Sequence, residues 1–169
     1  MIRLRPAASA DARAIARIHV ETWQTTYPGM LPDQTLIDLT IDGKARSWRA
    51  TLERPNPTGA VLLAEVPEEG VVGFASAGHN RHPNLPYAGE VETLYVLPDW
   101  QNQGIGRQLL TGCFEALRGQ GFASAVVWVL AENPARFFYE RMGGRRAGER
   151  DESLWGAVLH EVAYGWATI

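Results

Sequence analysis

The sequence predicts one domain in which helices pack on a mixed β-sheet, a fold of the α/β or α+β class. The chain has 169 residues, 46% of them hydrophobic, which suits one domain with a core of its own. Helical and strand-like patterns alternate without a repeat or a linker, so the domain is expected to span residues 1–169. Residues 90–130 have the pattern strand, helix, strand, which predicts a right-handed parallel crossover.

The first part of the chain predicts three helices. Ser9 can cap the first, which is expected to end before Pro28-Gly29. A short second helix is expected over residues 33–39, and Asp42 has the place of a cap for the third. The prolines of Pro55-Asn56-Pro57 then predict a loop. Apolar residues at helical spacing mark the buried faces of the first and third helices: Ile15, Ile18, Thr22 and Trp23, then Ala45, Trp48 and Leu52.

The middle of the chain changes to the period of strands. Residues 60–66 and 71–77 are expected to form two strands joined by a hairpin turn at Pro67-Glu68-Glu69-Gly70. A polar loop follows over residues 78–89, and a central strand over residues 90–97.

The last third alternates between helix and strand. Residues 98–103 lead into a strongly amphipathic helix that ends at Gly119 or Gly121. Residues 124–130 are almost continuously apolar, as in a strand that is buried on both faces. Two elements remain: a helix that Asn133-Pro134 opens and Gly143-Gly144 ends, and a last strand over residues 158–166.

Composition excludes several classes of function. The formal net charge of −3 leaves no basic footprint of the kind that nucleic-acid binding needs. No apolar run reaches the roughly 18 residues that a membrane-spanning helix requires, and no secretory signal pattern is present. The single cysteine, Cys113, rules out a disulfide framework and a cysteine-built zinc site, and no acidic ligands surround His79 and His82. We therefore expect a cytoplasmic protein without a metal, a membrane anchor or a nucleic-acid partner.

A glycine-containing turn joins the central strand to the amphipathic helix. Its sequence is Gln101-Asn102-Gln103-Gly104-Ile105-Gly106-Arg107, and the two glycines remove Cβ atoms where the chain turns. Free N–H groups at a helix N-terminus, together with the helix dipole, favour a phosphate or pyrophosphate there. Arg107 can add a charge-assisted contact.

Neither common nucleotide-binding pattern fits this turn. A Walker A loop needs Gly-Lys-Ser/Thr, which is absent, and a dinucleotide fingerprint needs a glycine where Leu109 stands. Two glycines alone are also compatible with a plain tight turn. The turn by itself therefore indicates a phosphate group without identifying its ligand.

The residues around the turn carry a resemblance to a family. Residues 101–106 resemble the Arg/Gln-x-x-Gly-x-Gly/Ala motif of the GNAT superfamily of acyl-CoA-dependent N-acetyltransferases. Leu94-Tyr95-Val96-Leu97-Pro98 resembles the end of that family's fourth strand, and residues 133–143 resemble its second cofactor motif. The resemblance implies a mixed, mostly antiparallel central sheet of about six or seven strands with helices on both faces. Two positions depart from the family: Gln101 replaces the commoner arginine, and Gly144 stands where an aromatic residue often follows the glycine.

The resemblance also implies acetyl-CoA as the acyl donor. Backbone groups of Leu94, Tyr95 and Val96 would bond the thioester carbonyl and the pantetheine amides, and so stabilise a developing oxyanion. Asn133 would contact the pantetheine arm, a role that is compatible with capping its own helix. The residues expected to hold the pyrophosphate are Gln101, Asn102, Gln103, Gly104, Ile105, Gly106 and Arg107.

Acetyl transfer to an amine needs a base, because an alkylamine with a pKa of about 10.4 arrives protonated at neutral pH. Glu90 and Glu92 stand at alternate positions of the central strand and therefore share a face. Burial or mutual repulsion would raise the pKa of one of them toward a value useful for a base. By analogy with the family, Glu92 acting through water is the first candidate, and Glu90 is the second. The alternative is that one or both are exposed acids beside a basic partner such as Arg81.

Tyr139 is the expected acid. A phenol stays protonated at neutral pH and can donate to a leaving thiolate, and the matching tyrosine of the family faces the cofactor sulfur. Without the motif, packing beside Phe137 and Phe138 would be the simpler interpretation. Cys113 lies mid-helix among apolar residues and is expected in the core. We therefore expect direct transfer in a ternary complex rather than a covalent acetyl-enzyme.

Aromatic residues indicate the acceptor side. Trp23, Tyr27 and Trp155 are the expected walls of an acceptor pocket and, with two acids, would suit a small primary amine or an amino group of a protein or peptide. The regions that form this pocket in the family also supply His19, His79, His82 and Tyr87, whereas Trp48 and Trp128 are expected in the core.

Other functions and assemblies remain open at this point. A non-catalytic acyl-CoA-binding regulatory module would share the glycine turn without needing Glu92 or Tyr139. A nucleotide-binding protein unrelated to acyl transfer is a third interpretation. Family members often dimerise through sheet edges or tails, so a homodimer is among the expected assemblies.

Overall fold

The computed structural model describes residues 1–54 and 59–169, so the loop predicted at Pro55-Asn56-Pro57 lies outside the described residues. Short 3-10 helices at Ser9–Asp11 and Pro98–Trp100 accompany the main elements. In chain order these are β1 (Arg3–Pro6), α1 (Ala12–Thr26), α2 (Asp33–Ile37), α3 (Ile41–Leu52), β2 (Gly59–Val66), β3 (Gly70–His79), β4 (Gly89–Val96), α4 (Ile105–Gly119), β5 (Ala125–Leu130), α5 (Ala135–Arg141), β6 (Arg145–Leu154) and β7 (Ala157–Trp166).

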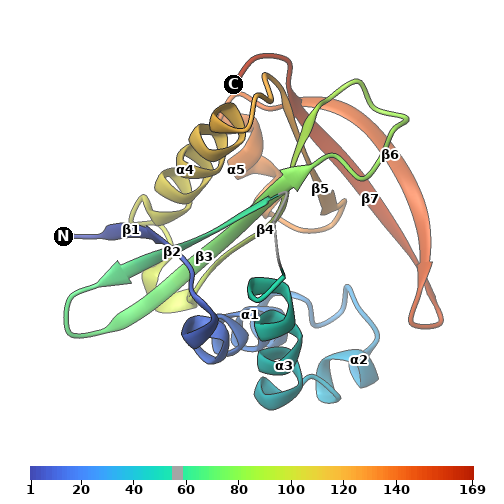
Figure 1. Cartoon of the computed structure of the whole chain (residues 1–169). Coiled ribbons are helices and arrows are strands. Elements are labelled where there is room, and N and C mark those ends of the chain that lie inside the picture. The colour runs from blue at the N-terminus through green and yellow to red at the C-terminus, as the bar shows by residue number, and fades with distance from the viewer. Residues whose placement is uncertain (55–58) are drawn as a thin grey trace.

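The strands form one twisted sheet with helices on both faces. Across the described ranges, seven strands pair in the order β1-β2-β3-β4-β5-β7-β6 (Figure 1). β4 and β5 run parallel, and the other neighbouring pairs of this sheet run antiparallel. Helices α1 to α3 lie on one side of the sheet and α4 and α5 on the other (Figure 1). The predicted mixed, mostly antiparallel sheet and the parallel crossover from β4 through α4 to β5 are confirmed.

The sequence patterns did not predict the two edge strands, β1 and β6. β1 has only four residues, and β6 is charged along most of its length. Edge strands are kept short or charged in natural proteins, because an apolar edge would pair with other chains. The features that protect these edges also remove the apolar alternation by which a strand is recognised in a sequence.

The first helix begins differently from the prediction. Ser9 makes no capping hydrogen bond; instead the Asp11 carboxylate accepts from the backbone N–H of Ala8 at 2.8 Å. Arg5 in β1 donates to both carboxylate oxygens of Asp11, each at 2.8 Å, and so ties the edge strand to this turn. An ion pair with a strand therefore fixes the helix start.

The caps of two later helices show one error and one confirmation. Thr40, not Asp42, caps α3, because its hydroxyl accepts from the backbone N–H of Gly43 at 3.1 Å. The Asn133 side chain accepts from the backbone N–H of Ala135 at 2.9 Å, as its predicted capping role requires. Asx capping of this kind satisfies a helix N–H that would otherwise lack a partner.

The main core lies between α4 and the sheet. The buried face of α4 contains Cys113, and burial raises the pKa of its thiol to about 12, so the predicted core role of this cysteine is confirmed. The other fully buried residues of this face are Ile105, Leu109, Leu110 and Leu117.

The centre of the sheet splits into two diverging strands. β4 and β5 pair at only three positions, from Gly89–Ala125 to Val91–Val127. Beyond them β4 continues beside β3, and β5 beside β7. A bulge reinforces the split, because Ser76 pairs with Thr93 and the next residue pairs with Val91, which leaves Glu92 as an extra residue. Among the described residues, one edge of β4 is therefore unpaired along its second half.

The space beside Gly144, into which a side chain at this position would extend, is filled by the ring of Trp166. A Cβ atom built on Gly144 would lie 2.8 Å from the Trp166 ring and 2.9 Å from the backbone oxygen of Tyr139. The Trp166 indole N–H donates to the backbone oxygen of Met142 at 3.0 Å, which holds the ring in place. The tryptophan of β7 therefore packs where an aromatic residue at position 144 would have to fit.

Gly144→Ala is expected to lower the free energy of unfolding by about 1–3 kcal/mol, the usual cost of overpacking against atoms that cannot move. Urea denaturation measures the change. Gly119→Ala is the matched control, because no atom lies within 4 Å of a Cβ at Gly119 and the residue is helical. The control is expected to be neutral or slightly stabilising. Equal stabilities of the two variants would contradict the packing role assigned to Trp166.

Candidate active site

A cavity of about 810 Å³ opens where β4 and β5 separate. Its volume is within the range of small-molecule sites, about 300–1,000 Å³. One end, called here the turn end, is lined by Gln101, Asn102, Gly104, Gly106 and Arg107. The other, called the acid end, is lined by Glu90, Glu92 and Glu161.

The turn end presents free N–H groups to the cavity. Gly104 has φ +81° and Asn102 φ +61°, left-handed conformations that turn the chain sharply into α4. The first backbone hydrogen bond of the helix is donated by Gln108 to the oxygen of Gly104, at 3.1 Å. In the described chain no acceptor meets the N–H groups of residues 103–107. This arrangement suits an anionic group such as a phosphate.

The side chains of the turn divide into two groups. Gln101 donates to the backbone oxygen of Val96 at 3.0 Å and ties the turn to the end of β4. Gln103 donates to the oxygen of Asp99 and Ile105 is buried in the core, so neither side chain lines the cavity. For these two residues only the backbone can serve the predicted binding role. Arg141 of α5, which the sequence did not single out, joins Arg107 in the lining.

The unpaired edge of β4 forms the floor between the two ends. Leu94, Tyr95 and Val96 line the cavity, and each pairs with β3 only. Backbone groups on an unpaired strand edge need partners from water or a ligand. The cavity therefore offers an extended molecule a strand-like row of donors and acceptors.

Glu90 is held by Arg81. Its side chain is 2% exposed and accepts from the Arg81 Nε at 3.0 Å, from a terminal guanidinium nitrogen at 2.8 Å and from the Arg81 backbone N–H at 3.1 Å. Burial opposes ionisation, but the hydrogen bonds from Arg81 outweigh it and lower the pKa of Glu90. Glu90 is therefore an ionised partner of Arg81, as the alternative interpretation expected, but it is buried and not exposed.

Glu92 differs from Glu90 in its surroundings. Its side chain is 34% exposed, and the nearest Arg81 nitrogen lies 3.8 Å away, beyond hydrogen-bond distance. Burial raises the pKa of Glu92, and the charge of Arg81 offsets part of that rise. A partly exposed carboxylate with a raised pKa can accept a proton through water near neutral pH.

Tyr139 of α5 also lines the cavity. The residue is 5% exposed, and burial raises the pKa of its phenol well above the usual value near 10. Asn133 at the start of the same helical segment is also buried and lines the cavity. Tyr139 is therefore protonated at neutral pH and available as a proton donor.

The three predicted aromatic walls come together. Trp23, Tyr27 and Trp155 all line the cavity, with ring centroids 5.2 Å apart for Trp23–Tyr27 and 5.9 Å for Trp23–Trp155. The four other candidates do not line it: His19, His79, His82 and Tyr87. His82 instead contacts Arg150, and the ring of Tyr87 packs against Gly165.

Other lining residues were missed or misjudged. Trp128, predicted in the core, borders the cavity because β5 leaves β4 just before it. The Arg150 guanidinium lies 4.1 Å from the centre of the Trp128 ring and bonds Glu161 at 2.6 Å. Arg150 belongs to the unpredicted strand β6, whose charged sequence over residues 145–154 lacks the apolar alternation that would have identified a strand.

Within residues 1–54 and 59–169, no three His, Cys, Asp or Glu side chains gather in a way that could hold a metal ion. None of the helices described there combines the length and apolar character of a membrane span.

Comparison with known proteins assigns a family. The model of the Acetyltransferase (GNAT) family matches residues 15–144. The chain is 34% identical to the uncharacterized N-acetyltransferase YuaI of Bacillus subtilis, over 98% of this chain and 93% of that protein. It is 33% identical to the phosphinothricin N-acetyltransferase of Streptomyces viridochromogenes, over 84% and 73%. The structure of yncA from Salmonella typhimurium with its cofactor acetyl-CoA shares the fold, with a TM-score of 0.71, 24% identity and coverage of 98% and 93%.

His19 does not line the cavity but packs against two residues that do. It is 6% exposed and lies against Trp23 and Tyr95, with ring centroids at 5.1 and 5.4 Å. Its Nδ1 accepts from the Trp48 indole N–H at 3.2 Å, which requires that this nitrogen carry no proton. Burial, assisted by the charge of Lys44, lowers the pKa of His19 to about 3.

Stability is therefore expected to fall as the pH drops from about 6.5 toward 3. In this window the unfolded chain binds a proton at His19 and the folded chain does not, which costs on the order of 1 kcal/mol per pH unit. Urea denaturation across the window measures the slope. His19→Gln is expected to reduce it, whereas the control His79→Gln, at an exposed histidine, is expected to retain it. An unchanged slope in His19→Gln would refute this account.

Proposed function

Since the chain belongs to the Acetyltransferase (GNAT) family, we propose that it moves the acetyl group of acetyl-CoA to a primary amine by direct transfer in a ternary complex. One observation carries the proposal. A single cavity joins free helix N–H groups at one end to a poised carboxylate at the other, with an unpaired strand edge between them.

The turn end suits the pyrophosphate of the donor. The N–H groups of residues 103–107 and the charges of Arg107 and Arg141 would hold this group. An arginine at position 101 is then not needed, and the Gln101 side chain instead bonds the end of β4. A Cβ atom at Gly106 would lie 3.4 Å from Phe138, an ordinary contact, so the protein's own packing does not require a glycine there. The missing side chain instead leaves the backbone open to a ligand. The pantetheine amides would bond the free edge of Leu94, Tyr95 and Val96.

The proposed reaction needs two proton transfers. Glu92 accepts a proton from the ammonium group through water, and the neutral nitrogen then attacks the thioester carbonyl carbon. The new C–N bond forms as the C–S bond breaks, and Tyr139 donates its phenolic proton to the leaving thiolate. The second proton, lost from the attacking nitrogen, passes to solvent, Glu92 releases its proton to solvent, and the phenolate of Tyr139 is reprotonated from solvent. Cys113 takes no part, because its thiol is buried in the core.

Glu90 supports the role of Glu92 as base by accepting the hydrogen bonds of Arg81. Two guanidinium donors of Arg81 point at Glu90, and only the longer 3.8 Å approach reaches Glu92. An arginine bonded fully to Glu92 would lower its pKa and weaken it as a base. In this proposal Glu92 is the base and Glu90 its positioning residue.

The experiment that tests the function combines binding with turnover. Acetyl-CoA and CoA, but not ATP, are expected to raise the thermal midpoint of the protein, and thiol release with acetyl-CoA is expected to depend on an added amine. Stabilisation by ATP alone would indicate a nucleotide-binding protein instead. Binding of CoA without release against any amine would indicate a regulatory module.

Tyr139→Phe is expected to lower kcat by about 10²-fold or more while leaving the Kd for acetyl-CoA within about twofold, because general acids contribute 10²–10⁴-fold to rates. Stopped-time thiol assays and isothermal titration measure the two quantities. Tyr164→Phe is the control: its hydroxyl donates to Glu140 at 2.8 Å and does not line the cavity. An unchanged kcat in Tyr139→Phe would remove this residue from the mechanism.

The two acids are expected to give different pH profiles. Glu92→Gln should lower kcat/KM by about 10²-fold and remove the acidic limb that reports its ionisation. Glu90→Gln frees Arg81 to bond Glu92, so the acidic limb should move to lower pH.

The control for both is Glu149→Gln, an exposed acid paired with Arg146 outside the cavity. Its profile should match that of the unmodified protein. Loss of activity at every pH in Glu90→Gln, with activity retained in Glu92→Gln, would reverse the assignment.

A further inference from the structure

The two segments that flank the acid end are joined by an apolar cluster. Leu31 and Leu36 from the α1–α2 region pack with Leu159 of β7, and each of the three is less than a tenth exposed. Partly buried residues complete the cluster: Trp23, Tyr27, Leu39, Leu130, Leu154 and Ala157. The β6–β7 hairpin is therefore docked on the α1–α2 region and does not stand away from it.

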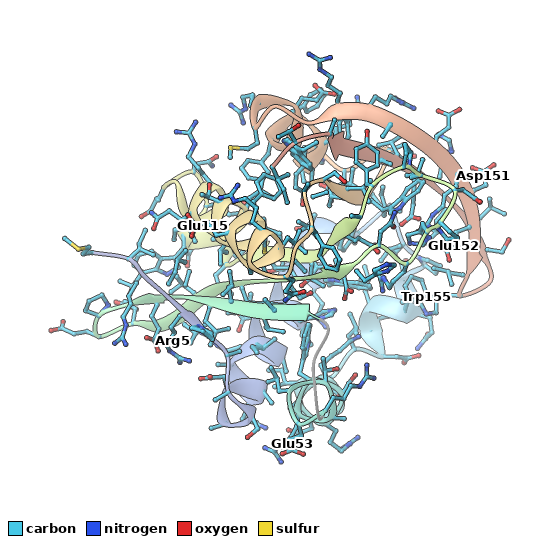
Figure 2. All side chains as sticks on the ribbon, turned by 45° about the horizontal axis from the view of Figure 1, so that its top comes forward. Arg5, Glu53, Glu115, Asp151, Glu152 and Trp155 are labelled. Atoms are coloured by element: carbon cyan, nitrogen blue, oxygen red, sulfur yellow. The ribbon has the colours of Figure 1, made fainter. Side chains whose placement is uncertain are left out.

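Trp155 extends this contact at the hairpin turn. Figure 2 labels Trp155 at the end of the hairpin, beside the pale blue helical segment, and its ring lies edge-on to Trp23 with the centroids 5.9 Å apart. A second cavity of about 370 Å³ also has Trp23 and Trp155 among its walls. The two rings thus form a partition between the acid end and the space beyond it.

The backbone at Trp155 is unusual for its side chain. Trp155 has φ +51° and Gly156 φ +76°, so both residues of the two-residue turn are left-handed. Such hairpin turns favour Asn-Gly, because bulky L-residues rarely adopt this conformation. Strained residues of this kind persist where surrounding contacts hold them and cluster at ligand sites. The side of the indole that is not exposed faces Trp23, and Trp155 as a whole is 51% exposed.

The lining of the acid end combines charge with an apolar wall. Glu92 lies in the same cavity as Trp23, Leu31, Leu154, Trp155 and Leu159. A polypeptide running between the hairpin and the α1–α2 region would have to separate the cluster or bury its backbone amides against this wall without partners. The same 810 Å³ must also contain the pantetheine arm of the donor, which leaves the acceptor only part of the volume.

We infer that the acceptor is a small primary amine with an apolar body, which packs against Trp155 and Trp23, and that the amino groups of polypeptides are excluded by the closed hairpin. The inference rests on the proposed function and specifies its substrate class. Trp155 would act as the specificity-determining residue at the closed end, and the ammonium group would lie toward Glu92.

Three probes separate the substrate classes: 2-phenylethylamine, putrescine and a tripeptide with a free α-amino group and an amidated C-terminus. The unmodified protein is expected to give a kcat/KM at least tenfold higher for 2-phenylethylamine than for either of the others. Trp155→Asn places in the turn a residue that this turn type favours. It should lower the kcat/KM for 2-phenylethylamine about tenfold and so reduce the ratio of this kcat/KM to that for the tripeptide. The KM for acetyl-CoA should stay within twofold.

Glu68→Asn is the matched control, because Glu68 also has a positive φ, +71°, in the distant β2–β3 turn. Both asparagine variants are expected to keep or raise the thermal midpoint, and only Trp155→Asn should change amine selectivity. Preference of the unmodified protein for the tripeptide, or unchanged selectivity in Trp155→Asn, would overturn the inference while leaving acetyl transfer standing. Absence of thiol release with all three probes, together with no binding of acetyl-CoA, would overturn the proposed function itself.

Discussion

The site depends on the point at which β4 stops pairing with β5. Three paired positions hold the two strands together, and from there each strand continues with only one neighbour. The bulge at Glu92 takes up the extra length and directs that residue into the opening. An open edge in the middle of a sheet would be unfavourable if it were sealed from both water and ligand. The divergence of β4 and β5 therefore produces three features together: the cavity, the unpaired backbone groups of β4 along it, and the surroundings of Glu90 and Glu92.

Electrostatics within the cavity compensate for the charge of the whole chain. The formal net charge is −3, so the overall field does not attract an anionic donor. The lining is polarised, however, with Arg107 and Arg141 at the turn end and three glutamates at the acid end. An anion and a cation entering this cavity are thereby directed to opposite ends of it. Arg81 and Arg150 also lie at the acid end, where each is bonded to a carboxylate.

Local signals in the sequence were sufficient for much of the fold. The glycine turn, the cap at Asn133 and the apolar face of α4 depend on neighbours within one or two turns, and the structure confirms them. Ser9 and Trp128 were misjudged because distant partners decide their roles: Arg5 for the first helix and the strand divergence for Trp128. The error at Asp42 is local, because Thr40, two residues earlier, caps the third helix instead. The pairing of Arg81 with Glu90 rather than Glu92 is equally a tertiary matter, since spacing along the strand treats both acids alike.

The β6–β7 turn lies apart from the elements that line the turn end and hold the acids. The hairpin lies at the edge of the sheet, and its two turn residues lie between the strands and outside their pairing. On the inference that Trp155 selects the acceptor, replacing this residue would alter what the acid end accommodates without touching β4, the glycine turn or α5. A lineage built on this scaffold can therefore diversify its acceptors by small changes at one peripheral loop while the chemistry at the centre is inherited intact.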